Sequence, residues 1–258
     1  MRPALQRIGA LVLAFVGWLG GTTAMFMRAV TVGPRRPLGV DDIVHQTLML
    51  GVRSLPISAF LSLFIGMILA QQFGDALQDF GMTMALGKTS SVALVNELVP
   101  TLLALTVGSK MAAGMTAELG SMKVTEQIDA VAALGADPIK KLVWPRVVAS
   151  TLTLPLLVVG GNVLALAGGM LIGELIFGVP SAYFYEQFVA YLEPIDYFQS
   201  LLKGTVFGAL VGVIGCYNGF DTGYGTESVG LATTQTVVAS ALCIIVADFY
   251  IGMLFIGS

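Results

Sequence analysis

The sequence has little charge and few of the residues that build catalytic or metal sites. Lys, Arg, Asp and Glu make up 11% of its 258 residues, against roughly 25% in a soluble domain, and there is one histidine. Two cysteines, Cys216 and Cys243, lie in separate apolar segments without CxxC spacing, so they predict neither a disulfide framework nor a metal site. A formal net charge of −3 leaves no overall basic surface for nucleic acid. These shortages exclude an ordinary soluble enzyme and a nucleic-acid-binding protein.

Apolar residues, in contrast, make up 56% of the chain. In water, a chain of this length cannot bury so much apolar surface behind so few charges. Five runs are long enough to cross about 30 Å of hydrocarbon, and they are continuous rather than alternating, which favours helices. The predicted spans are Leu55–Ala70, Val92–Val107, Val148–Phe177, Leu201–Cys216 and Val237–Ile256. The fold class expected is an all-α integral membrane protein.

A sixth apolar run, Ile8–Met27, is compatible with a signal peptide, a span or a helix in the membrane interface. Eleven of the thirteen Lys and Arg residues lie before the first predicted span or between the second and third: Arg2, Arg7, Arg28, Arg35, Arg36, Arg53, Lys110, Lys123, Lys140, Lys141 and Arg146. The positive-inside rule places both regions in the cytoplasm. Five spans satisfy this rule, with the amino terminus inside and the carboxyl terminus outside. If Ile8–Met27 also crossed the membrane from the inside, the second basic region would lie outside. We therefore favour one domain with an interfacial segment over residues 1–45 and a five-span core over residues 46–258. Six spans with an external amino terminus are the alternative.

Two carboxyl groups fall inside predicted spans, Glu97 in the second and Asp248 in the fifth. A carboxyl group in hydrocarbon costs several kcal/mol unless it is paired, protonated or faces water or protein. We expect Glu97 to be functional and Asp248 to make a structural hydrogen bond. Lys203 is assigned to the region between the third and fourth spans, so no intramembrane Lys or Arg is expected to pair with either carboxyl group. A self-contained secondary transporter or channel that uses Glu97 and Asp248 is the alternative function.

Small residues recur every fourth position in two spans: Gly161, Ala165, Gly169 and Gly173 in the third, and Gly204, Gly208 and Gly212 in the fourth. Each set forms a smooth ridge on one helix face, which lets another helix approach closely. Intramolecular packing and a dimer seam are equally compatible with this pattern.

The cytoplasmic segment between spans two and three contains a predicted short helix, Met122–Leu134, with Val124, Ile128 and Val131 on one face. Gly135 follows as an expected carboxyl cap, and Asp137-Pro138 ends the pattern. Such a helix rests on the membrane surface or docks in a groove of a partner protein.

The stretch from Asn96 to Ser150 closely resembles the signature region of the MlaE (YrbE) family of ABC-transporter permeases. The matching anchors are Glu97 and Pro100, then Thr116–Met122, Glu126–Ala130 and Asp137-Pro138. The later stretch Cys216–Val238 also looks like the family's second cytoplasmic loop. In one respect the chain departs from the pattern: Asn96 stands where the family often has Arg or Lys, which puts an adjacent basic partner for Glu97 in doubt.

The resemblance implies a homodimeric permease domain over residues 1–258 with an interfacial amino-terminal helix and five spans per subunit, in a bacterial inner membrane. It implies partners that are a cytosolic ABC ATPase and a periplasmic MCE-domain protein, with phospholipid as cargo. ATP and Mg would bind to the ATPase, with no cofactor on this chain and no enzymatic activity of its own. Carried over by position, the implied lipid-cavity residues are Leu69, Leu77, Phe80, Glu97 and Leu98. The implied coupling helix, about residues 121–138, would dock on the ATPase through Glu126, Gln127, Ile128, Asp129, Val131, Leu134, Gly135, Asp137 and Pro138.

Overall fold

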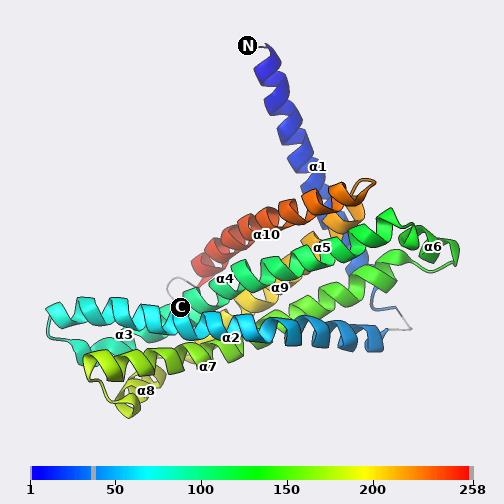
Figure 1. Ribbon diagram of the computed structural model, residues 1–258. Helices are drawn as coiled ribbons and strands as arrows, with labels where there is room; N and C mark the ends of the chain where they lie inside the picture. Colours follow the sequence, from blue (N-terminus) through cyan, green and yellow to red (C-terminus); the bar gives the residue numbers. More distant parts are fainter. Residues whose placement is uncertain (1, 36–38, 256–258) are drawn as a thin grey trace.

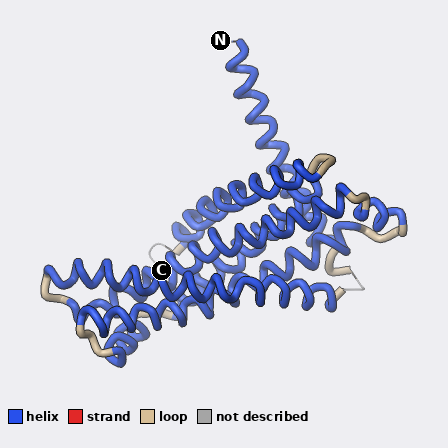
Figure 2. Tube along the Cα trace, in the orientation of Figure 1, coloured by secondary structure: helices blue, strands red, loops and turns tan. Residues whose placement is uncertain are grey.

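The computed structural model describes residues 2–35 and 39–255, and in these residues every regular element is helical (Figures 1 and 2). The predicted end of the last span, Ile256, and the predicted basic residue Arg36 lie outside the described residues. The elements are α1 (Arg2–Val32), α2 (Val40–Asp79), η1 (Thr83–Ala85), α3 (Leu86–Val92), η2 (Ala93–Leu98), α4 (Val99–Leu103), η3 (Ala104–Gly108), α5 (Ser109–Val124), α6 (Gln127–Ala133), η4 (Ile139–Val143), α7 (Trp144–Phe177), α8 (Ser181–Ala190), α9 (Pro194–Asp221) and α10 (Thr226–Leu254).

Six helical segments among the described residues are long and apolar enough to cross a membrane: Val12–Val32, Val40–Asp79, Thr83–Val124, Ile139–Phe177, Pro194–Asp221 and Thr226–Leu254. They coincide with most of the sixth run and with the five predicted spans, which confirms the all-α membrane fold. The helices extend well beyond the apolar runs. The 40 residues of α2, for example, measure about 60 Å at 1.5 Å per residue, twice the thickness of the hydrocarbon.

Helix α1 crosses the other long helices steeply, and its amino-terminal part projects away from them (Figure 1). Its carboxyl-terminal end packs on the rest of the chain, where Gly33 lies so close to the Trp144 ring that a Cβ atom would overlap it. A helix that crosses the bundle axis in this way fits a position along the membrane interface, although the length and hydropathy of Val12–Val32 also suit a span. The interfacial placement therefore stays a prediction.

The glycine ridges pack inside the chain. Helices α2 and α7 lie side by side (Figure 1), and a Cβ atom on Gly66 would overlap the carbonyl oxygen of Ala165. On the other side of α7, a Cβ atom on Gly204 of α9 would lie 2.9 Å from the Cα of Pro155. All seven ridge residues are buried within the single chain. The intramolecular interpretation is therefore confirmed for these ridges, and the dimer-seam interpretation is wrong.

The third of these membrane-crossing segments is continuous from Thr83 to Val124 but contains two π-helical turns, η2 and η3. Pro100 lies between these turns, at the start of α4. Because proline has no backbone N–H and its ring crowds the preceding turn, an ordinary α-helix would lose a hydrogen bond here. The wider π turns keep this segment helical around Pro100, and they place Glu97 in a locally widened turn.

Candidate functional site

Lys203 lies at the centre of a three-residue charge cluster within the membrane-spanning helices. Its Nζ atom is 2.7 Å from Oε2 of Glu97 and 2.8 Å from Oδ1 of Asp248. The lysine comes from α9, Glu97 from the π turn η2 and Asp248 from α10, so one ammonium group joins three elements that are distant in sequence. Although the nitrogen is within ion-pair distance of both carboxylates, neither contact has hydrogen-bond geometry, so the attraction is mainly electrostatic.

This cluster corrects the prediction that no intramembrane Lys or Arg would pair with the two carboxyl groups. The assignment of Lys203 to the region between two spans is wrong, because α9 already begins at Pro194 and Lys203 is completely buried. The available signal was its position two residues inside the apolar run that starts at Leu201. A buried lysine needs a counter-charge, and the two carboxyl groups inside spans supply it.

The start of α9 explains why Lys203 meets Glu97. Glu193 and Asp196 form a reciprocal capping box around Pro194, which fixes the first turn of α9. The other carboxylate oxygen of Asp196 accepts a hydrogen bond from Nδ2 of Asn96, at 2.6 Å. Asn96, which stands where the family often has Arg or Lys, therefore ties the π turn to α9. The basic partner of Glu97 comes from that same helix, about two turns further along.

The three charged side chains differ in their exposure. Lys203 is fully buried and Asp248 is 18% exposed, whereas Glu97 is 52% exposed. In their ionised forms the three groups sum to one negative charge. The Glu97 carboxylate points to the surface beside α10, where a Cβ atom on Gly252 would lie 3.7 Å from Oε1. Glu97 is therefore the most exposed member of the cluster, and its counter-charge is fixed underneath.

The predicted cytoplasmic helix Met122–Leu134 is not continuous, which corrects its expected boundaries. Helix α5 ends at Val124, where the Thr125 hydroxyl donates to the carbonyl of Ser121. Glu126 then takes a left-handed conformation, with φ at 57°, and α6 begins at Gln127. Because a left-handed residue cannot continue a right-handed helix, the chain turns between the two helices. The expected glycine cap is confirmed, since Gly135 follows α6 with φ at 80°.

The residues implied as the coupling surface fall into two groups. Glu126, Gln127, Asp129, Leu134 and Gly135 are exposed on the α6 turn, and the Leu134 side chain is among the most exposed apolar groups of the described chain. Ile128 is buried, and Val131 and Pro138 are half-buried. Asp137 holds the turn in place: one carboxylate oxygen accepts the Ile139 N–H at 2.9 Å, and the other lies 3.4 Å from Nη2 of Arg28 in α1.

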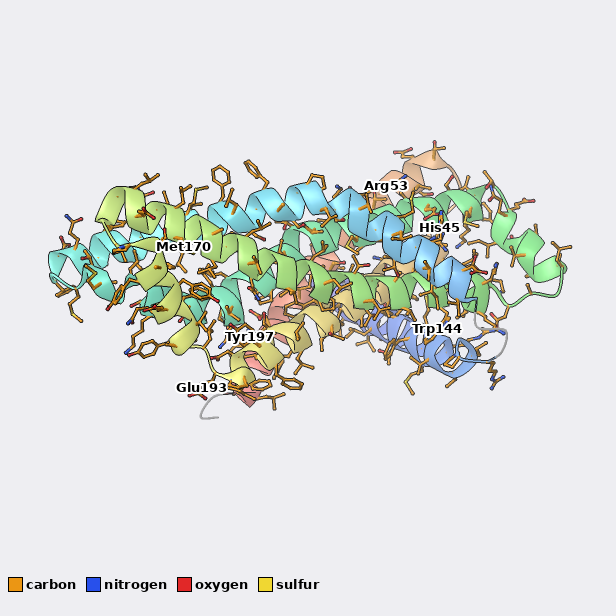
Figure 3. The ribbon with its side chains drawn as sticks, turned by 90° about the horizontal axis from the view of Figure 1, so that it is seen from below. His45, Arg53, Trp144, Met170, Glu193 and Tyr197 are labelled. Carbon is orange, nitrogen blue, oxygen red and sulfur yellow. The ribbon has the colours of Figure 1, made fainter. Side chains whose placement is uncertain are left out.

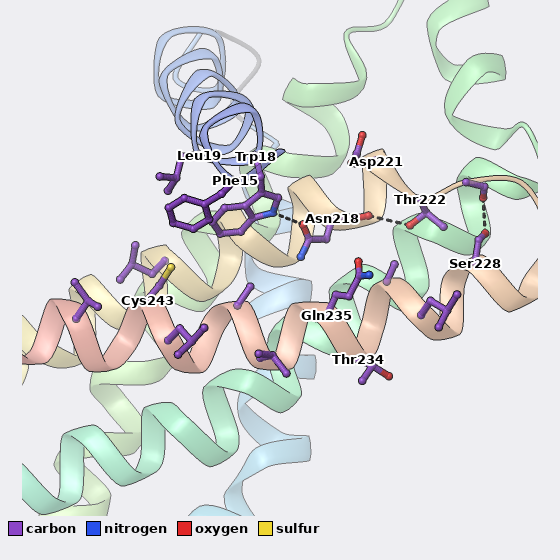
Figure 4. Close-up of a pocket in the computed structure, with 18 of the residues that line it drawn as sticks. Phe15, Trp18, Leu19, Asn218, Asp221, Thr222, Ser228, Thr234, Gln235 and Cys243 are labelled. Atoms are coloured by element: carbon purple, nitrogen blue, oxygen red, sulfur yellow. Dashed lines mark hydrogen bonds between the residues drawn. The ribbon is translucent and has the colours of Figure 1, made fainter. Parts of the chain in front are cut away.

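A groove of about 1160 Å³ runs between α1, α9 and α10 (Figure 4). Phe15 and Trp18 of α1 face Cys243 of α10 across it, and the indole N–H of Trp18 donates to Oδ1 of Asn218 at 2.8 Å. Asn218 in turn donates to the hydroxyl of Thr236. Neither the charge cluster nor the residues implied as a lipid cavity line this groove. Part of its lining, from Asn218 to Val238, falls in the stretch Cys216–Val238 that resembles the family's second cytoplasmic loop.

Comparison with protein families gives a match to the family described as Permease MlaE over residues 43–254. This chain belongs to the MlaE permease family. The match covers more than four fifths of the chain, including the charge cluster and the α6 turn.

Curated relatives of this MlaE-family permease match over most of their length. A probable ABC transporter permease protein of Rickettsia felis is 36% identical over 248 residues, which is 96% of each chain. The intermembrane phospholipid transport system permease protein MlaE of Haemophilus influenzae is 30% identical over 255 residues, or 98% of each chain. The chloroplastic protein TRIGALACTOSYLDIACYLGLYCEROL 1 of Arabidopsis thaliana is 35% identical over 83% of this chain and 61% of its own.

Membership of this family, with six apolar helices, identifies a multi-pass inner-membrane protein that is an ABC-transporter permease subunit. The residues implied as a lipid cavity differ in their exposure in the single permease chain. Leu69 is buried, Leu77 and Leu98 are half-buried, and Phe80 is exposed beyond the end of α2. Glu97 is the polar member of this set. A cavity that all five residues line stays a prediction.

Proposed function

We propose that this permease moves phospholipids, or related hydrophobic molecules, between the inner membrane and the outer envelope. Two copies would form the transmembrane part, and the five implied cavity residues would face the lipid between them. A cytosolic ABC ATPase would supply ATP hydrolysis, and a periplasmic MCE-domain protein would exchange the lipid. The Haemophilus influenzae relative is named as the permease of an intermembrane phospholipid transport system, which supports this choice of cargo.

The half-exposed Glu97 carboxylate, fixed from below by buried Lys203, is the observation that carries the proposal. A phospholipid needs an apolar surface for its chains and a limited polar surface for its headgroup. A polar group set in a π turn of an apolar span provides both within one helix. The cluster also joins η2, α9 and α10, so a change in the packing of these helices would alter the environment of Glu97. Transport requires such a change, because the affinity for the lipid must differ between two states.

The α6 turn is the surface that we assign to the ATPase. It lies at one end of the bundle (Figure 1), with Glu126, Asp129 and Leu134 exposed and with Asp137 tying it to α1. The turn continues directly through η4 into α7, the long helix that packs on both α2 and α9. A movement of the ATPase would therefore reach the centre of the bundle through a single continuous helix.

Purification from the native membrane in mild detergent, followed by mass spectrometry of intact complexes, tests this function. We expect two copies of the chain with a stoichiometric ABC ATPase, an MCE-domain protein and bound phospholipid. A stable chain that purifies alone and free of lipid would contradict the proposal. Ion flux through liposomes that contain only this chain would instead support a secondary transporter or channel using Glu97, Lys203 and Asp248.

A further inference from the structure

A second pocket, of about 440 Å³, lies between α2 and α5 and is separate from the Lys203 cluster. Its titratable lining comes from His45 and Arg53 on α2 and from Lys110 and Glu118 on α5. Figure 3 shows His45 and Arg53 along the part of α2 that leads to the α6 end of the bundle, with Met170 toward the opposite end. The pocket therefore lies in the half of the molecule that carries the α6 turn.

The apolar runs fix the depth of this pocket. Arg53 comes two residues before the run that starts at Leu55, and Lys110 comes three residues after the run that ends at Val107. Since those runs must lie in hydrocarbon, both cationic groups fall at the boundary between hydrocarbon and headgroups. A charged pocket at this level meets the headgroups of one leaflet rather than bulk solvent alone.

The pocket carries unpaired positive charge. Its carboxylate, Glu118, is already paired with Arg146 at 2.8 Å, and the Arg146 side chain is 5% exposed. In the part of the chain that the structure describes, neither Arg53 nor Lys110 forms an ion pair, and both side chains are exposed. Two cationic groups from adjacent helices therefore line one pocket without a counter-ion from the protein.

We propose that this pocket binds the phosphate of an anionic phospholipid headgroup from the leaflet at the α6 end. A guanidinium group and an ammonium group together suit a phosphate diester, because arginine offers a planar pair of donors and lysine a compact charge. Basic pockets between membrane helices are known to bind such headgroups. Met49 and Met111 also line the pocket and provide apolar, adaptable contacts for the glycerol and the first acyl carbons. The site does not include the Glu97 cluster, so the lipid that it holds need not be the lipid transported.

Native mass spectrometry of the full chain, exchanged into detergent with phosphatidylglycerol or phosphatidylcholine, tests the proposal. We expect wild-type protein to retain phosphatidylglycerol at least about tenfold better than phosphatidylcholine. Arg53→Gln combined with Lys110→Gln should remove that preference. The matched control is Arg35→Gln with Lys140→Gln, which removes the same charge from residues outside the pocket and should keep the preference. Arg53→Lys combined with Lys110→Arg keeps both charges and should also keep it, which separates lost binding from misfolding.

Several results would overturn the proposal. Equal retention of the two lipids by the wild type would exclude an anionic headgroup site. Equal loss in the pocket variant and the control variant would indicate diffuse surface charge. Displacement of phosphatidylglycerol by millimolar inorganic phosphate would indicate a site for free anions instead. None of these results bears on whether the complex transports lipid, so failure here is distinguishable from failure of the proposed function.

Discussion

Lys203 and Glu97 are 106 positions apart in the sequence, and their charged atoms lie 2.7 Å apart in the fold. The lysine is fully buried and the glutamate is half-exposed, so the pair joins the inside of the bundle to its surface. Asp248 contacts the same ammonium group from α10.

Lys203→Met should destabilise the protein strongly, because it leaves two carboxylates in apolar surroundings without their shared counter-charge. Removing one partner of a buried pair costs about 3 to 5 kcal/mol, which a thermal unfolding series in detergent detects as a clear drop in the melting temperature. The triple variant Lys203→Met, Glu97→Gln, Asp248→Asn removes the whole cluster and should recover most of the loss. A Lys203→Met protein as stable as wild type would contradict the buried ion pairs.

Gly66→Ala should separate α2 from α7, because the added methyl group would overlap the carbonyl oxygen of Ala165. Overpacking of this kind costs about 1 to 3 kcal/mol, and here the obstacle is backbone rather than a flexible side chain. Gly160→Ala is the matched control, since nothing lies within 4 Å of its added Cβ atom. It should leave stability unchanged or raise it slightly, by up to about 1 kcal/mol. Equal melting temperatures for the two variants would show that α2 and α7 do not pack as described.

Glu126→Lys should leave the permease folded but uncouple ATP hydrolysis from transport, because Glu126 is exposed on the α6 turn. Glu126→Gly is the informative comparison: it removes the side chain while relieving a left-handed conformation that costs a non-glycine residue roughly 1 to 2 kcal/mol. We expect the glycine variant to be slightly more stable than wild type and the lysine variant to bind the ATPase less tightly. ATPase binding measured on immobilised permease distinguishes them, and unchanged coupled transport in Glu126→Lys would count against docking at this turn.

Asp137→Arg should act differently, through the fold of the turn itself. It removes the acceptor for the Ile139 N–H and places a positive charge against Arg28. Loss of such a capping bond costs about 1 kcal/mol, and the melting temperature should fall accordingly. Asp129→Arg makes the same charge change at an exposed position of α6 and serves as the control. If both variants melt at the wild-type temperature, Asp137 does not hold the turn to α1.

The membrane spans could be predicted from the sequence because lipid imposes a long apolar run on every helix that crosses it. The ends of the helices could not, since α2 and α10 begin far before their apolar runs, where nothing in hydropathy separates helix from loop. The break at Glu126 was missed for a related reason: a glutamate in the left-handed conformation has no sequence signature, whereas Gly135 at the end of α6 has one.

The charge cluster was half predicted. Glu97 and Asp248 were recognisable because a carboxyl group inside an apolar run is rare. Lys203 obeys the same rule, but it lies near the start of its apolar run and was interpreted as part of the preceding region. That Lys203 pairs with both carboxyl groups depends on the tertiary packing of η2, α9 and α10, which spacing along the chain does not encode.

The most direct test of Glu97 as the polar contact for lipid is ATP-driven transfer of a labelled phospholipid by proteoliposomes that contain the complete transporter. Wild type, Glu97→Gln and Glu97→Leu are compared with Glu186→Gln and Glu186→Leu, which change an exposed glutamate on α8. We expect about a tenfold loss for Glu97→Gln, a larger loss for Glu97→Leu and normal transfer for both Glu186 variants. Full lipid transfer by both Glu97 variants would contradict a role for Glu97 in the lipid cavity.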